Sequence, residues 1–173
     1  PRDWYNVKND ANIFGLEPNF GCCTANMHQG WPKFVKNLWF ATPEGGLAAV
    51  VYAPCRLQAK VAEGVEITII EDTKYPFDTD IHLKIQTPSR VRFPLRLRIP
   101  CWCEGAIIYL NDRRERIADR GIYHTISREW NHNDRIRLHL PMKIRTAAWY
   151  HNSISVERGS IVFALHIDED YRE

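Results

Sequence analysis

The chain has 173 residues, of which 45% are apolar and 25% charged, and these values suit a globular protein of one ordinary domain. Its formal net charge of +2, from 23 basic and 21 acidic residues, argues against a nucleic-acid partner. The sequence has no run of about 18 apolar residues, so we expect no membrane span.

Residues 1–23 contain Asn, Asp, Gly and Pro without a helical or strand period. A loop of this length is either functional or the end of something larger. The sequence begins with Pro1 and ends at DEDYRE, directly after an apolar segment. We therefore expect the chain to be a fragment of a longer protein.

Cys22 and Cys23 are neighbours at the end of this loop. A disulfide between adjacent residues is strained by the planar trans peptide, and the odd total of five cysteines argues against a disulfide framework. The cysteine usage favours a reducing compartment or a metal. From the residues alone, two interpretations stay open: a pair of buried structural thiols, or a thiolate that binds a metal or acts as a nucleophile.

Apolar residues recur at i, i+4, i+7, i+8 and i+11 after Thr24, which is a plausible N-cap, and they predict a helix over residues 24–39. Pro32 predicts a bend in this helix, or a start at that residue. The periodic residues are Met27, Trp31, Phe34, Val35 and Leu38, of which the last four form the predicted inward face. If the helix belongs to a preceding helical domain, we expect this face to be uncovered or to be covered by a second copy of the chain.

Short segments of alternating polarity follow Gly46 to the end of the chain. Strict period two is clearest in LRLRI, residues 95–99, and IRLHL, residues 136–140. About ten short strands at such spacing predict an antiparallel β-sandwich of two sheets over residues 47–167, resembling a jelly roll. The sequence thus predicts a mostly β fold that is preceded by a loop and one helix.

Six segments point, in this order, to a family: EPNFGCCTANMHQGWPKFVKNLW, GGLAAVVYAP, YPFDTDIHLKI, LRLRIPCWCEGA, HTISREWNHNDRIRLHLPM and ERGSIVFAL. From about Glu17 to about Leu165 the chain resembles the C-terminal part of the β-L-arabinofuranosidase-like glycoside hydrolases, family 127 and its relatives. The Cys-Cys pair, with Asn26 three residues later, carries the resemblance most specifically. The resemblance implies that residues 1–45 are the tail of a catalytic (α/α)6 barrel and residues 46–173 a β-sandwich domain.

The resemblance also implies a zinc ion held by a glutamate and three cysteines, one of which is the nucleophile. It assigns Cys22 as nucleophile and metal contact, Cys23 as zinc ligand and His28 as a weak candidate substrate contact. The remaining ligands and the acid/base glutamate are expected upstream, and Glu17 does not match that motif. We expect a bacterial, retaining hydrolase of plant-type oligosaccharides, in the cytoplasm or periplasm. By itself this chain is expected to bind no zinc and to be inactive.

Two other classes of function remain open from the sequence. The sandwich is either a carbohydrate-binding module, with some of the six tryptophans as a stacking platform, or a structural module that supports the barrel and takes part in a homodimer through the helix face. A binding module should bury the helix face and carry an aromatic groove. Cys101 and Cys103 resemble half of a metal site, but no second pair has zinc-finger spacing, which favours packing in the core or at an edge.

Overall fold

The computed structural model describes residues 26–166, apart from the side chains of residues 116 and 117. The chain divides into two compact units, residues 1–38 and residues 39–173, and each is considered by itself. In the described range, no helix has the length and apolar character that a membrane crossing requires.

The helix is shorter than the sequence predicts. A helical turn at residues 26–27 is followed by a break at His28 and Gln29, and α2 then covers Gly30–Lys36. The break lies four residues before Pro32, whose ring clashes with the carbonyl of residue i−4 and which has no N–H to donate. Pro32 itself sits in the first turn of α2, where backbone N–H groups have no helical partner anyway. The predicted end at residue 39 is also wrong, because Trp39 opens a strand.

The apolar face of the helical segment is largely exposed. Met27, Trp31, Phe34 and Val35 have exposed fractions between 41% and 76%, whereas Leu38 is buried. The prediction that Trp31, Phe34, Val35 and Leu38 pack inward is therefore wrong for the first three and right for Leu38. The other expectation, a face left uncovered in this chain, agrees with the structure.

The first sheet of the second unit has four strands, in the order β1-β2-β6-β9. Its pairs are antiparallel except for β2 and β6, which are parallel. Gly46 makes that pairing possible, because a Cβ at this position would lie 2.1 Å from the carbonyl oxygen of Pro94. The strands are β1 (Trp39–Ala41), β2 (Leu47–Ala49), β6 (Val91–Arg98) and β9 (Tyr123–Trp130).

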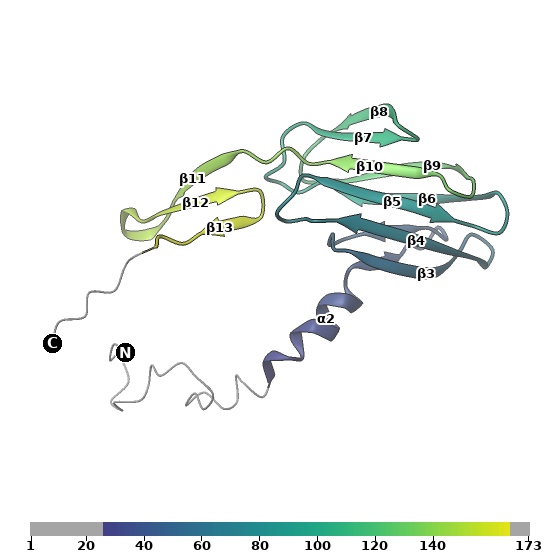
Figure 1. The fold of residues 1–173 in the computed structure, drawn as a ribbon, viewed down its shortest axis with the longest axis horizontal. Helices are drawn as coiled ribbons and strands as arrows, with labels where there is room; N and C mark the ends of the chain where they lie inside the picture. The colour runs from purple at the N-terminus through teal and green to yellow at the C-terminus, as the bar shows by residue number, and fades with distance from the viewer. Residues whose placement is uncertain (1–25, 167–173) are drawn as a thin grey trace. The chain divides into compact units, whose positions relative to one another are not determined.

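The second sheet has six antiparallel strands, in the order β3-β4-β5-β10-β7-β8 (Figure 1). Consecutive strands pair as hairpins in three places, and β10 inserts between β5 and β7. The strands are β3 (Cys55–Val61), β4 (Val65–Thr73), β5 (Asp80–Gln86), β10 (Arg135–His139), β7 (Ala106–Leu110) and β8 (Arg113–Ala118).

A third, three-stranded antiparallel sheet follows, which the two-sheet prediction did not include. Its strands are β11 (Ile144–Ala148), β12 (Ile154–Arg158) and β13 (Ile161–Phe163), with a short 3-10 turn η1 (Tyr150–Asn152) after β11. Gly159 in the β12–β13 turn has φ +61°, and a Cβ there would lie 2.7 Å from the sulfur of Met142. A side chain at this position would therefore be strained and crowded.

Alternation of buried and exposed residues builds the core between the two larger sheets. Every second residue of β5, β6, β7 and β10 is buried, as is every second residue of β4 from Ile67 on. Burying each such Leu, Ile or Phe side chain stabilises the fold by about 1.5–3 kcal/mol. The predicted fold class, a mostly β, antiparallel sandwich, is confirmed. The fully buried large side chains include Ile69, Ile81, Leu83, Ile85, Phe93, Leu95, Leu97, Ile108, Trp130 and Ile136.

Candidate functional site

The predicted catalytic residues lie largely outside the described range. Cys22 and Cys23 precede residue 26, so their roles as nucleophile and zinc ligand remain predictions. His28 lies in the break before α2 and is exposed. Beside it, Gln29 Nε2 donates to Asn26 Oδ1 at 2.8 Å. The role of His28 as a substrate contact also remains a prediction.

The two cysteines of the Cys-Trp-Cys segment lie in different surroundings. Strand β6 ends at Arg98, so Cys101 and Cys103 do not continue on one strand face; Cys101 is exposed and Cys103 is buried. Burial, and then the nearby Glu104 carboxylate, raise the pKa of the Cys103 thiol to about 11, so it stays protonated. Within residues 26–166, no three His, Cys, Asp or Glu side chains are placed to hold a metal ion.

The structure reveals a buried carboxylate, Glu71, that sequence reasoning missed. Glu71 on β4 is 2% exposed and accepts hydrogen bonds from three donors. They are the indole Nε1 of Trp39 at 2.9 Å, the backbone N of Ala53 at 3.1 Å and the Sγ of Cys55 at 3.6 Å. Because Trp39 belongs to the four-stranded sheet, this carboxylate links the two sheets through the core.

The period-two pattern contained the signal for this site. In VEITIIED, residues 65–72, Ile67 and Ile69 face the core, and the same register places Glu71 inward. An acidic residue in a buried row needs hydrogen-bond donors, since an unpaired buried carboxylate is very unfavourable. The sequence could therefore have shown that Glu71 is buried, but not which residues surround it.

Burial raises the pKa of Glu71 from 4.5 to about 7. The hydrogen bonds from its three donors favour the anion and lower the pKa, but burial has the larger effect. Burial, and then the Glu71 carboxylate, also raise the pKa of the Cys55 thiol to about 11. The thiol thus keeps its proton and can donate it to Glu71. Burial followed by Glu71 likewise raises the pKa of Tyr52, whose hydroxyl donates to the carbonyl oxygen of Arg98 at 2.8 Å.

We expect the free energy of unfolding to fall as pH rises from about 4.5 to about 7 and then to level off. The folded state holds the Glu71 proton more tightly than the unfolded state, so folding is favoured at low pH and loses this advantage as pH passes the folded pKa. A pKa raised from 4.5 to about 7 corresponds to a decrease in the free energy of unfolding on the order of 3 kcal/mol across this pH range.

Urea titrations across this pH range, on wild type and Glu71→Gln, measure the effect. Glutamine keeps the shape of the side chain but does not titrate, so the Glu71→Gln variant should lose most of the slope. Glu66→Gln is the matched control, because Glu66 lies on the same strand and its carboxylate is exposed. Equal slopes for Glu71→Gln and Glu66→Gln would contradict the assignment.

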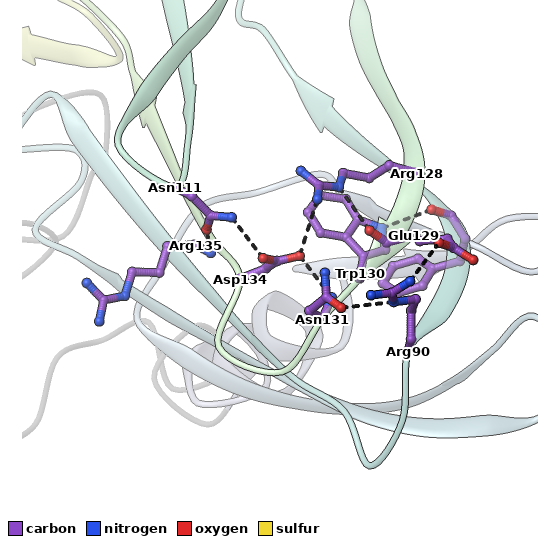
Figure 2. Close-up of polar contacts among 9 residues, drawn as sticks. Arg90, Asn111, Arg128, Glu129, Trp130, Asn131, Asp134 and Arg135 are labelled. Carbon is purple, nitrogen blue, oxygen red and sulfur yellow. Dashed lines mark hydrogen bonds and ion pairs between the residues drawn. The ribbon is translucent and has the colours of Figure 1, made fainter.

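A second buried carboxylate, Asp134, organises the loops at one end of the sandwich (Figure 2). Its Oδ1 accepts from Asn111 Nδ2 at 2.8 Å, and its Oδ2 accepts from the backbone N of Asn131 at 2.9 Å. The Arg128 guanidinium lies 3.8 Å from Oδ2. These contacts tie the β7–β8 and β9–β10 turns together, which is a structural role.

Taken together, residues 39–166 define a β-sandwich protein whose core is apolar and whose buried carboxylates are hydrogen-bonded. Residues 46–142, more than half of the chain, match the family model of the β-L-arabinofuranosidase GH127 middle domain. The chain therefore belongs to the GH127 β-L-arabinofuranosidase family.

Solved structures with the same fold agree with this assignment. A GH127 β-L-arabinofuranosidase from Geobacillus stearothermophilus T6 shares 26% identity at a TM-score of 0.74, over 83% of this chain and 24% of its own. A second GH127 β-arabinofuranosidase shares 24% identity at a TM-score of 0.74, over 86% of this chain and 27% of its own. A protein described as a glycoside hydrolase shares 20% identity at a TM-score of 0.75, over 90% of this chain and 28% of its own. The chain thus spans about a quarter of each solved relative, and the two matches below 25% identity show the fold alone. A comparison with curated proteins gives no match.

Proposed function

We propose that this chain is the C-terminal part of a retaining β-L-arabinofuranosidase-like glycoside hydrolase that acts on plant-type glycans. Residues 1–45 would complete its helical catalytic domain and supply Cys22, and residues 46–173 would form the supporting sandwich. The match of residues 46–142 to the GH127 middle domain, directly after the segment with the Cys-Cys pair, carries the proposal. The exposed apolar face around Trp31 and Val35 supports it too, because a large exposed apolar patch marks an interaction surface.

The chemistry assigned to Cys22 is nucleophilic displacement at a sugar carbon. The thiolate attacks the anomeric carbon, a C–S bond forms, and the glycosidic C–O bond breaks as the leaving oxygen takes a proton from an upstream carboxylic acid. Water then attacks the same carbon, gives its proton to that carboxylate and displaces the thiolate. Two inversions at one carbon retain its configuration.

The two cysteines can supply two of the four ligands that a zinc ion usually takes in proteins. Zinc in proteins is usually four-coordinate and takes thiolate ligands readily, so Cys22 and Cys23 would hold it from two positions. Within residues 26–166, no three His, Cys, Asp or Glu side chains cluster to hold a metal ion. The proposal takes the other ligands from the upstream part of the full-length protein. Bound there, zinc would keep the Cys22 sulfur deprotonated at neutral pH.

A stacking platform for sugars on the sandwich is a weaker alternative. Trp130 is buried in the core, and the Arg137 guanidinium lies 3.8 Å from the centre of the Tyr109 ring, which it covers. Neither of these two residues presents a free aromatic face for a sugar ring, whereas Trp149, directly after β11 of the three-stranded sheet, is 63% exposed and remains a candidate for such a contact.

The chain alone should show no hydrolysis of a nitrophenyl β-L-arabinofuranoside, with zinc supplied, whereas the full-length protein should hydrolyse it. Without the upstream acid, the chain lacks general acid catalysis, which by itself contributes on the order of 10²–10⁴-fold. Hydrolysis by the isolated chain at the rate of the full-length protein would contradict the proposal that the acid lies upstream of this chain. A full-length protein inactive on every furanoside tested would contradict the proposed activity itself.

A further inference from the structure

The outer face of the six-stranded sheet carries a hollow of about 380 Å³ that has no assigned role, which is within the size range of small-ligand sites. Ile70 of β4 pairs with Lys84 of β5, and Lys84 pairs with Arg135 of β10, so these three side chains form one row across the sheet. The neighbouring row consists of Asp72, His82 and Arg137. Side chains two positions apart on a strand share a face, so both rows line the same hollow.

The hydrogen-bonded β7–β8 turn completes the rim of the hollow. Asn111 and Asp112 in the β7–β8 turn have positive φ angles of 47° and 66°, a conformation that Asn and Asp adopt more easily than most residues. The backbone N of Asn111 donates to the carbonyl oxygen of Arg135 at 2.9 Å, and the backbone N of Arg135 donates to Asn111 Oδ1 at 2.8 Å. Asn111 Nδ2 in turn donates to the buried Asp134 (Figure 2). Asp112 and Arg135 are thus presented by a hydrogen-bonded frame.

Four charged side chains in the hollow have no polar partner within residues 26–166. Asp80 lies outside the hollow, and its Oδ1 is 2.9 Å from His139 Nδ1 and 3.6 Å from Arg137 Nη1. The charge of Arg137 is therefore already compensated. Among the described residues, no ion pair and no side-chain hydrogen bond engages the remaining four, although they line one hollow. They are Asp72, Lys84, Asp112 and Arg135.

Two carboxylates and two cations give a hollow with no net charge and with both donors and acceptors. An anionic ligand would meet Asp72 and Asp112, and a cationic ligand would meet Lys84 and Arg135. A neutral sugar satisfies all four, because its hydroxyl groups donate to carboxylates and accept from Lys and Arg in charge-assisted hydrogen bonds. The partly exposed Ile70 offers an apolar contact for the C–H groups of the ring.

We infer that this hollow on β4, β5 and β10 binds a neutral saccharide unit, through hydrogen bonds to Asp72, Lys84, Asp112 and Arg135. This goes beyond the proposed hydrolysis at Cys22, and it assigns the sandwich a carbohydrate-binding role without an aromatic platform. Binding should depend little on salt, since the ligand is neutral.

Amide chemical shifts of the ¹⁵N-labelled chain, titrated with methyl β-L-arabinofuranoside and neutral arabino-oligosaccharides, test the inference. We expect saturable shifts at Ile70, His82 and Lys84. Asp72→Ala and Arg135→Ala should each weaken binding by roughly tenfold or more, as expected when a hydrogen bond to a charged group is lost. Lys60→Ala is the matched control, because Lys60 is an exposed cation on the same sheet that pairs with Glu66, and this variant should bind as wild type does.

Three results would overturn the inference: no saturable shift with either sugar, shifts confined to other parts of the chain, or unchanged binding by both hollow variants. Galacturonate binding more tightly than the neutral sugars would also overturn it, because it would indicate an anion site. The readout is binding and not hydrolysis, so it is independent of whether the proposed glycosidase activity is correct. Unchanged far-UV circular dichroism of the variants shows that they are folded.

Discussion

Replacing Cys22 with serine in the full-length protein is expected to reduce turnover of β-L-arabinofuranosides by on the order of 10⁴-fold or more, as loss of a nucleophile does in other covalent mechanisms. The two side chains differ by one atom, so the fold should survive. A serine hydroxyl, however, has no accessible anion at neutral pH and binds zinc poorly. The assay is steady-state hydrolysis of a nitrophenyl furanoside, with zinc supplied.

Cys23→Ser is the companion variant, because the neighbouring thiol is assigned as a zinc ligand only. We expect it to lose activity together with bound zinc, measured by metal analysis of the purified protein. Wild-type turnover by the Cys22→Ser protein would end the nucleophile assignment. Full zinc content in an active Cys23→Ser protein would end the ligand assignment.

Trp130→Ala is expected to destabilise the sandwich by about 3–5 kcal/mol, as large-to-small changes of buried aromatic residues do. Trp130 is fully buried, its Nε1 donates to the carbonyl oxygen of Phe93 at 3.0 Å, and its ring centre lies 5.8 Å from that of Phe93. The substitution leaves a cavity and a carbonyl oxygen without its indole donor. Thermal unfolding should shift down by roughly 10 °C in a domain of this size.

Trp149→Ala serves as the control for that change. Trp149 is 63% exposed and donates to Ser155 Oγ at 2.8 Å, so its loss should cost about 1 kcal/mol or less. Equal losses of stability in the two variants would show that Trp130 is not a core anchor.

Much of the sandwich could be predicted from local pattern alone. Period two in segments such as residues 95–99 and 136–140 correctly indicates which side chains are buried, because successive residues of a strand face opposite sides. The pairing of β2 with β6 could not be predicted, since it depends on a close approach of Gly46 to Pro94 across a long stretch of chain. The break at His28 and Gln29, before α2, follows from Pro32, whose local effect is stronger than the apolar periodicity.

Of the candidate sites, one could be predicted from the sequence and the other could not. Cys22, Cys23 and His28 stand in a contiguous motif, so a resemblance could assign them roles. The hollow on the second sheet unites Asp72, Lys84, Asp112 and Arg135 from three strands and a turn. That grouping depends on the insertion of β10 between β5 and β7, which no local pattern encodes.

Peptide mass mapping of the acid-quenched full-length enzyme, taken during turnover of an activated β-L-arabinofuranoside, tests the central claim most directly. A covalent glycosyl-enzyme intermediate predicts one pentosyl group on the peptide that contains Cys22, located on that sulfur by fragmentation, and none in the Cys22→Ser protein. A pentosyl group on another side chain would contradict the account. In particular, the account would be contradicted if the pentosyl group were found on an upstream carboxylate while Cys22 carried none.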